Sequence, residues 1–476
     1  MTSLDLLALL PIILPGLGAV VALLVGSFVP RHGLIAAITA GAMAAGVLAT
    51  FAVMPLVPHV IMGQLALDGR ALFFWLLILG AALVVAGLAF PFLAQRRVRG
   101  EAHHREFHVL LVLATVGAMV LAAASHFAAM FIGLELLSLC LFGLLAYEAE
   151  HGRALEAGMK YLVLSAASSA LLLFGLALLY TAGGSLSLHG LPMDTAGAQR
   201  PYVLGGMALV LVGMGFKLSL VPFHMWAPDV YEGAPAPVTA FLASVSKAAA
   251  AAWLLRLLET TDAWSLTTVS LTVAVLAAAS MLVGNLLALA QENIKRLLAY
   301  SSVSHMGYLS VPLAAGGALA GEAVMFYAAA YVIMSLAAFG VVGVLSRDTP
   351  GQEVVHLSAY RGLFWRRPLV AGTLAVALVS LAGIPVTIGF VGKFYVFAAG
   401  VEAALWWLLA VLVASSAIGL YFYLRVLAVL FASSGAVAER HRDGLAGGLL
   451  AVLLAAIVLL GLLPGALVEV VSAAAP

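Results

Sequence analysis

The chain has 476 residues, of which 64% are hydrophobic and 9% are charged, and its formal net charge is +1. Soluble domains carry about 25% charged residues, so this composition excludes a soluble globular protein and predicts an integral membrane protein. The near-neutral charge gives no reason to expect nucleic acid as a partner. The single cysteine, Cys140, excludes an internal disulfide and an iron–sulfur cluster held by this chain alone.

Fourteen apolar stretches are long enough to cross a membrane, since a span needs about 20 apolar residues. They cover 5–29, 33–54, 71–93, 107–124, 127–147, 154–180, 201–221, 238–258, 266–290, 296–315, 322–346, 368–387, 403–431 and 446–471. Because the N-terminus lacks a basic leader, the first stretch is interpreted as a retained helix. The sequence therefore predicts an all-α polytopic membrane protein.

The basic residues outside the spans are concentrated in every second connection, and therefore on one side of the membrane. Connections after odd-numbered spans hold Arg31, Arg96, Arg97, Arg99, Arg105, Arg153, Lys295, Arg296, Arg347, Arg361, Arg366, Arg367, Arg440 and Arg442. Connections after even-numbered spans hold only Arg70, Arg200 and Arg256. Because positive charge concentrates on the cytoplasmic side, this bias predicts an even number of spans with both termini outside the cytoplasm.

One span contains a lysine followed by a helix breaker. Lys217 lies 16 residues into the seventh span, and Pro222 follows it in "GFKLSLVPFHMW". Interrupted membrane helices expose free carbonyls and dipole ends, which are tolerated only inside protein or around water. We therefore predict a break between Ser219 and Pro222, and a functional role for Lys217. His224, Trp226, Asp229 and Glu232 are interpreted as residues that shape this break and the following loop.

Three further lysines lie within predicted spans, where a charge costs about 2.5 to 3.5 kcal/mol if it faces lipid. Lys247 lies near the centre of the eighth span, with Ser244 and Ser246 nearby. Lys393 follows a second proline–glycine break, and anchoring at the membrane interface is its alternative role. Lys160 is close to a loop, so its side chain can also extend to the headgroups.

Glu135 is the one carboxylate well inside a span; unpaired it would be neutral, and a nearby ammonium would favour its charged form. Lys160 and Lys217 are both within reach on sequence grounds, and the choice stays open. His305, ten residues into the tenth span, can relay protons or be a hydrogen-bonded core residue with Ser301 as its partner. No second histidine has the spacing of a metal site, so no metal is expected.

A weak internal repeat links the two predicted breaks. "LSLVPF" at 218–223 resembles "VSLAGIP" at 379–385, and the two broken helices, spans seven and twelve, are five positions apart. An odd offset inverts the direction of the second helix. Paired broken helices in inverted repeats are typical of transport proteins, with the path near the midplane.

These motifs together resemble the antiporter-like membrane subunits of respiratory complex I, in particular the subunit N branch. The resemblance covers nearly the whole chain. Its most specific part is "PFHMWAPDVYEGAPAPVTAFLASVSK" at 222–247, supported by "GLELLSLCLFGLLAYE" at 133–148, "EAGMKYLVLSAASSALLLFG" at 156–175, "NIKRLLAYSSVSHMGYL" at 293–309 and "LAGIPVTIGFVGKFYVF" at 381–397.

The resemblance implies a division of the chain into four parts. They are N-terminal helices 1–3 at 1–106, inverted repeats of five helices at 107–258 and 259–432, and helix 14 at 433–476. It also implies a proton-translocating relay in which Glu135 pairs with Lys217, Lys247 lies on the central axis and Lys393 serves the exit. His305 and Lys160 extend this axis.

The implied activity is that of a subunit of NADH:quinone oxidoreductase without a redox centre or cofactor of its own. Electron transfer in partner subunits supplies the energy. The implied partners are the bilayer and other membrane subunits of the M, K, J and L types, in the bacterial inner membrane with periplasmic termini. Two rivals stay open, which are a subunit of an Mrp-type cation/proton antiporter and a scaffold that does not conduct.

Overall fold

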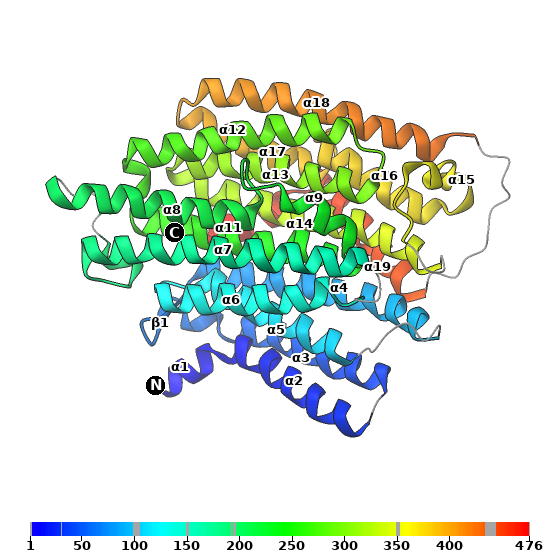
Figure 1. Cartoon of the computed structure of the whole chain (residues 1–476), viewed down its shortest axis with the longest axis horizontal. Helices are drawn as coiled ribbons and strands as arrows, with labels where there is room; N and C mark the ends of the chain where they lie inside the picture. Colours follow the sequence, from blue (N-terminus) through cyan, green and yellow to red (C-terminus); the bar gives the residue numbers. More distant parts are fainter. Residues whose placement is uncertain are drawn as a thin grey trace.

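The computed structural model is a bundle of long helices that run roughly side by side (Figure 1). It describes residues 2–29, 31–98, 105–148, 152–191, 193, 197–348, 353–433 and 444–475. Three of the arginines used to orient the chain, Arg99, Arg440 and Arg442, lie outside the described residues.

In its described residues, the first half of the chain has two short strands and eleven α-helices. Their bounds are α1 Ser3–Ala8, α2 Leu10–Phe28, α3 His32–Ala52, β1 His59–Ile61, β2 Leu65–Leu67, α4 Gly69–Val98, α5 Arg105–Ala123, α6 Phe127–Leu145, α7 Gly152–Gly183, α8 Arg200–Leu218, α9 Trp226–Gly233, α10 Ala236–Phe241 and α11 Lys247–Thr260. The strands form an antiparallel hairpin between α3 and α4. A π-helical turn, Leu242–Ser246, joins α10 to α11, so these three pieces make one continuous helix, called helix 8 below.

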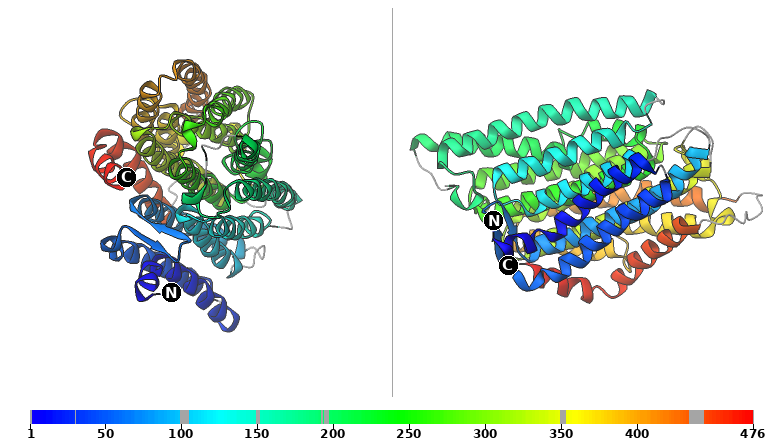
Figure 2. Two further views of the ribbon diagram at one scale, coloured as in Figure 1. Left: turned by 90° about the vertical axis from the view of Figure 1, so that its left-hand side faces the viewer. Right: turned by 90° about the horizontal axis from the view of Figure 1, so that it is seen from below.

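The second half is helical, with short 3-10 turns. Its helices are α12 Thr267–Leu289, α13 Ile294–Ala315, α14 Ala318–Asp348, α15 Leu363–Arg366, α16 Pro368–Ala382, α17 Ile388–Glu402, α18 Trp406–Phe431, α19 Gly444–Leu462 and α20 Gly465–Ala474. In the end-on view, α2 and α3 (blue) lie at one edge of the bundle and α18 (orange) lies at the other (Figure 2).

Twelve helices of the described chain are long and apolar enough to cross a membrane. The largely buried α13 is less apolar because it carries four serines and His305, and the α16–α17 pair is split into two shorter pieces. Counting both brings the crossings to fourteen, as the sequence predicts. The two termini lie at the same end of the bundle, which an even number of crossings requires (Figures 1 and 2).

Both predicted helix breaks are confirmed, and they have the same local structure. α8 ends with Ser219 in the left-handed conformation, with hydrogen bonds from the Ser219 and Leu220 amides back to Phe216 and Gly215. α16 ends with Gly383 in that conformation and with the same two hydrogen bonds, to Ser380 and Val379. This is the Schellman ending, which satisfies two of the terminal carbonyls and leaves the last ones free.

Three sequence expectations need correction. The first span begins at Leu10, because the residues before it form the separate helix α1. The last span divides at Pro464, which has no amide hydrogen to continue α19, into α19 and α20. Lys295 and Arg256 do not lie in connections, because Lys295 belongs to the first turn of α13 and Arg256 to the last turns of α11.

Helix 8 and α14 form the centre of the bundle. Every residue in the most apolar window of helix 8 is buried, and 83% of that of α14 is buried. Close backbone contacts bring the surrounding helices together: a Cβ added at Gly117 on α5 would collide with the backbone of Gly133 and Leu137 on α6. Small residues allow such approach, and close packing of this kind holds membrane helices together.

A buried ion pair fixes the end of helix 8 that points toward the hairpin side. Arg256 donates two hydrogen bonds to Asp68, at 2.6 Å and 2.9 Å, and Arg70 pairs with Glu259 beside it. Burial alone would raise the pKa of Asp68, but the hydrogen bonds and charge of Arg256 outweigh it and hold that pKa below its usual value. Asp68 therefore stabilises the fold in its ionised form.

Asp68→Asn should lower the free energy of unfolding by about 3 kcal/mol at pH 7, because it leaves the buried Arg256 without its counter-charge. A group with a lowered pKa in the folded state stabilises above its ordinary pKa of about 4 and loses this effect as the pH falls below it. The difference between wild type and variant in thermal unfolding in detergent should thus shrink below about pH 4. Glu156→Gln, at an exposed pair, is the control; an equal loss there would contradict the assignment.

Candidate functional site

Lys217 lies in a pocket formed by three helices. It is in the last turn of α8 and 5% exposed, and its ammonium donates to Ser138 Oγ on α6 at 2.6 Å and to Ser165 Oγ on α7 at 2.8 Å. The ring of Tyr161 lies 5.5 Å from the same ammonium. Lys217 therefore does not extend to lipid headgroups; its charge is held by neutral hydroxyls and an aromatic face.

Glu135 lies one helical turn before Ser138 on α6, so both face the same side of that helix. Its Oε1 accepts a hydrogen bond from Ser169 Oγ at 2.5 Å. In the described part of the chain Glu135 forms no direct ion pair with either candidate lysine. Of the two, Lys217 is the one linked to it, because Ser138 binds Lys217 and neighbours Glu135 on the helix.

Lys160 lies elsewhere, in a polar cluster at the end of the bundle. Its ammonium is 2.6 Å from Glu156 and 2.7 Å from Asp229, and 38% of its side chain is exposed. The side chains of this cluster line a cavity of about 210 Å³; they are Arg153, Glu156, Lys160, Asp229, Glu232 and Arg296. The alternative in which Lys160 pairs with Glu135 is therefore wrong, because both carboxylates that Lys160 binds lie in this cluster.

Lys247 docks onto the end of the first broken helix. Its ammonium donates to the carbonyl of Leu218 at 2.9 Å and to Ser219 Oγ at 3.0 Å, and the side chain is 1% exposed. Ser244, expected to be near it, bonds instead to the carbonyl of Ala240 in its own helix. The π-helical turn immediately before Lys247 is a rare feature that is frequent at functional sites.

Lys393 docks onto the end of the second broken helix in the same way. Its ammonium donates to the carbonyl of Ala382 at 2.9 Å and to Ser416 Oγ at 2.8 Å, and it lies 4.8 Å from the ring of Tyr308. Leu218 and Ala382 occupy equivalent positions, each one residue before the left-handed residue of its break. The interfacial-anchor alternative for Lys393 is wrong, since its ammonium points to the break.

His305 is buried between two tyrosines. Its Nδ1 lies 2.8 Å from Tyr327 Oη and its Nε2 lies 3.2 Å from Tyr423 Oη. Ser301, the expected partner, bonds to Tyr423 and so reaches the imidazole only through that hydroxyl. Because the ring of Tyr308 lies 5.5 Å from His305 and also faces Lys393, these two titratable groups are neighbours.

Hydroxyl groups continue from His305 back toward the first break. Tyr331, whose ring lies 5.5 Å from that of His305, donates to Ser302 Oγ at 2.7 Å. Ser302 is 3.4 Å from Tyr231 Oη on α9. The sequence-predicted residues Glu135, Lys217, Lys247, His305 and Lys393 therefore lie along the inside of the bundle, with serines and tyrosines between and around them.

Three of the four residues expected to shape the first break and the following loop, Trp226, Asp229 and Glu232, bond to neighbouring helices. The indole of Trp226 donates across the break to the carbonyl of Phe216 at 3.1 Å. Asp229 and Glu232 both accept hydrogen bonds from Arg296, at 2.8 Å and 3.0 Å. These contacts tie α9 to α8 and α13.

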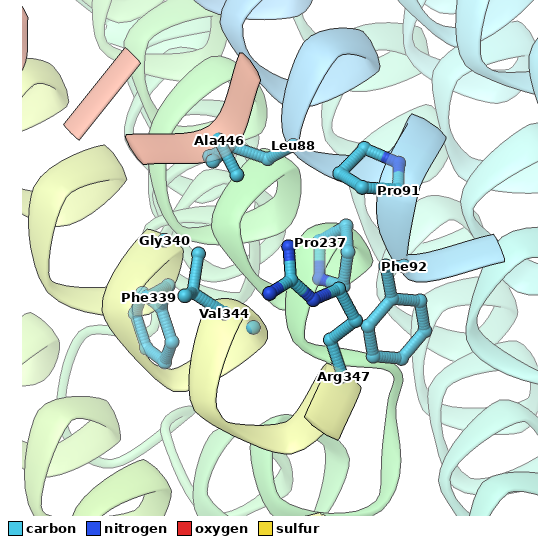
Figure 3. Close-up of a pocket in the computed structure, with 10 residues that line it drawn as sticks. Leu88, Pro91, Phe92, Pro237, Phe339, Gly340, Val344, Arg347 and Ala446 are labelled. Carbon is cyan, nitrogen blue, oxygen red and sulfur yellow. The ribbon is translucent and has the colours of Figure 1, made fainter. Parts of the chain in front are cut away.

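Two other features of the described residues concern metal and ligand binding. No group of three or more His, Cys, Asp or Glu side chains in the described ranges can hold a metal ion. A small apolar pocket with Arg347 beside it lies between α4, helix 8, α14 and α19 (Figure 3). None of the lysines described above lines this pocket.

Sequence reasoning missed the neutral partners of the charged groups. Ser138, Ser165, Ser169, Ser416, Tyr308, Tyr327 and Tyr423 each contact one of the ionisable residues. Their polar side chains within apolar spans are the only signal for them in the sequence. The presence of a serine or tyrosine in an apolar span does not show which lysine or histidine it contacts in the folded chain.

Comparison with known proteins gives the family. The family described as "NADH:quinone oxidoreductase/Mrp antiporter, TM" matches residues 124–419. The chain is 44% identical over 481 residues to the NADH-quinone oxidoreductase subunit N of Ectopseudomonas mendocina, covering 100% of this chain and 97% of that protein. The chain therefore belongs to this family of antiporter-like membrane subunits, within its subunit N branch, and the resemblance predicted from the sequence is confirmed.

Solved structures agree with this assignment. A chain of respiratory complex I from Thermus thermophilus with bound aureothin is 34% identical, with a TM-score of 0.84, and the match covers 98% of this chain and 100% of that one. A chain of an archaeal membrane-bound sulfane sulfur reductase is 25% identical with a TM-score of 0.87, covering 99% and 97%. The same architecture thus occurs in more than one respiratory membrane complex.

Ser138→Ala should destabilise the fold by about 1.5 to 3 kcal/mol, because it removes an acceptor from the buried ammonium of Lys217. Thermal unfolding in detergent measures this effect. Ser310→Ala is the matched control, since this buried serine on α13 bonds only to Met306 in its own helix. Equal effects of the two variants would mean that Ser138 is an ordinary packing residue.

Proposed function

We propose that the chain is a proton-translocating membrane subunit of an NADH:quinone oxidoreductase. The observation that carries this proposal is the set of ammonium groups of Lys217, Lys247 and Lys393, which neutral oxygens hold within the helix bundle. A charge in the membrane interior is costly and usually marks an ion pathway. Family membership, shown by a full-length relative, supports the same reading.

In this proposal, protons move between groups that each bind a proton only moderately well. Hydroxyls and carbonyls stabilise an ammonium without neutralising it, so a small change near one lysine alters which group holds the charge. Glu135, which lies one helical turn before the Ser138 that binds Lys217, is the group placed to supply such a change. The proton then passes from Lys247 on the central axis by way of His305 to Lys393, and the ring of Tyr308 lies beside both of the last two groups.

The energy must come from partner subunits. Moving one charge across 100 mV requires about 2.3 kcal/mol, and this proposal gives the chain no redox centre and no cofactor. The partners are other membrane subunits of the M, K, J and L types. The chain lies in a bacterial inner membrane with its termini on the periplasmic side, and the loop end of the bundle with Lys160, Arg153 and Arg296 faces the cytoplasm.

We further propose that residues 107–258 and 259–432 are inverted repeats, flanked by 1–106 and 433–476. The support is the identical Schellman ending at Ser219 and Gly383, each with a lysine on the last free carbonyl. The two broken helices are the seventh and twelfth crossings; since four crossings lie between them, they also run in opposite directions through the bundle.

The second candidate function is a subunit of an Mrp-type cation/proton antiporter, because the matched family includes both. Transport by the purified complex distinguishes the two. Dependence on sodium would favour the antiporter, and co-purification with flavin and iron–sulfur subunits would favour the oxidoreductase.

Lys217→Met should lower the rate of proton pumping by about 10²-fold, the usual contribution of a positioned proton-transfer group. Pumping is measured in membrane vesicles during NADH oxidation, and assembly is checked on native gels. Arg200→Met is the control, because Arg200 is exposed at the opposite end of the same helix. Full pumping by an assembled Lys217→Met complex would remove Lys217 from the relay and support the scaffold alternative.

A further inference from the structure

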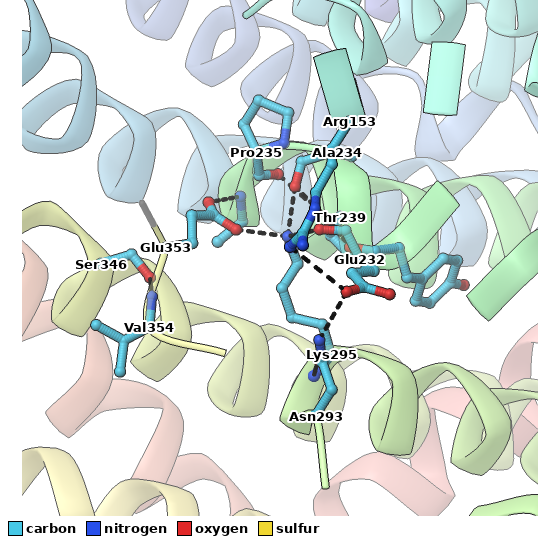
Figure 4. A network of polar contacts seen from close by, with 12 residues as sticks. Arg153, Glu232, Ala234, Pro235, Thr239, Asn293, Lys295, Ser346, Glu353 and Val354 are labelled. Atoms are coloured by element: carbon cyan, nitrogen blue, oxygen red, sulfur yellow. Dashed lines mark hydrogen bonds and ion pairs between the residues drawn. The ribbon is translucent and has the colours of Figure 1, made fainter. Parts of the chain in front are cut away.

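Lys295 is a fully buried lysine that the relay described above does not use. It is the second residue of α13, and its side chain has no exposed surface. Its ammonium donates to the carbonyl of Glu232 at 3.1 Å, to the carbonyl of Ala234 at 2.5 Å and to Glu353 Oε2 at 2.5 Å (Figure 4). One ammonium therefore joins the end of α9 to the connection between α14 and α16.

Glu353 completes the arrangement from the other side. Its Oε1 accepts a hydrogen bond from the amide of Ala236, at 2.7 Å (Figure 4). This amide belongs to the first residue of α10, where a helix has unpaired N–H groups and favours a negative charge. Lys295 and Glu353, called the charge clamp below, thus bind both the last carbonyls of α9 and the first amide of helix 8.

The segment that carries Glu353 is itself fixed to the bundle. The amide of Ile294 donates to the carbonyl of Val355 at 2.8 Å, and the amide of Leu357 donates to the carbonyl of Glu292 at 2.9 Å. Ser346 on α14 accepts from the amide of Val354 at 3.0 Å. The charge clamp is therefore attached to α13 and α14, which belong to the second half of the chain, whereas the turn that it holds belongs to the first half.

Helix 8 connects the charge clamp to Lys247, because Ala236 and Lys247 belong to the same helix. Lys247 is eleven residues after Ala236, which corresponds to roughly 16 Å along a helix. The most apolar stretch of the helix is entirely buried, and its far end is held by Arg256 and Asp68. The contact of Lys247 with the carbonyl of Leu218 thus depends on the position of helix 8 along its own axis.

We propose that Lys295 and Glu353 are positioning residues for the relay, which set the position of helix 8 so that Lys247 stays on the end of the broken helix α8. This inference rests on the proposed function. Neither residue carries the proton. Their ion pair connects the second half of the chain to the helix that bears the central lysine, so a displacement of the α14–α16 connection would be passed to Lys247.

The test uses the complete complex in membrane vesicles, with three variants: Lys295→Met, Glu353→Gln and the double variant. Each single variant should lower the number of protons pumped per NADH oxidised, by up to about 10²-fold, which is the cost of misplacing a reacting group by 1 Å. A single variant also leaves an unpaired buried charge and so can reduce assembly. The double variant removes both charges and should restore assembly on native gels, but not the pumping ratio.

The matched control is the double variant Asp5→Asn with His59→Gln, which removes a different ion pair, 2.9 Å long, between α1 and β1. Its pumping ratio should equal that of wild type. Wild-type pumping by the assembled single variants, or recovery of pumping together with assembly in the double variant, would overturn the positioning role. Lys217→Met is measured in parallel: if it alone loses pumping, the relay stands and only the charge clamp proposal fails.

Discussion

The docking of an ammonium on the carbonyl end of a broken helix is the interaction on which the rest of this structure depends. A charged lysine in a membrane needs oxygen partners, and an unbroken helix offers none, because its carbonyls are already bonded. Ser219 and Gly383 end their helices in a left-handed residue and leave Leu218 and Ala382 with free carbonyls. The two breaks therefore supply the free carbonyls that the lysine ammonium groups need as acceptors. The ammonium groups in turn supply hydrogen-bond donors to those carbonyls.

The charged groups divide into two kinds by the partners that they have. At the ends of helix 8, Lys295 and Arg256 form ion pairs with carboxylates, and such buried pairs fix geometry because breaking them is costly. Along the inside of the bundle, Lys217, Lys247 and Lys393 have serine hydroxyls and backbone carbonyls as acceptors. A lysine with neutral partners holds its proton less firmly than one paired with a carboxylate. The ends of helix 8 are therefore fixed in position, whereas the lysines inside the bundle can release their protons more easily.

The fold does not by itself identify the activity. Similar architectures occur in a bacterial complex I and in an archaeal sulfane sulfur reductase, and the matched family includes Mrp antiporters. What these proteins share is a bundle that can place ionisable groups in the membrane interior. The proposed function therefore rests on the lysines, His305 and their partners, together with the full-length match to a subunit N protein.

The sequence by itself determined the membrane class, the even number of crossings, the two breaks and the ionisable residues inside the spans. These follow from local composition, from the sidedness of arginine and from the cost of charge in lipid, all of which can be read along the chain. Tertiary structure alone decided that Lys160 pairs with Asp229 and that Lys217 meets Ser138, 79 residues away. It also decided that Lys295, which the sequence pattern places in a connection, is buried. Which side chains meet depends on how each helix is rotated and packed against its neighbours, and in a chain this uniformly apolar the hydrophobic pattern does not specify that rotation.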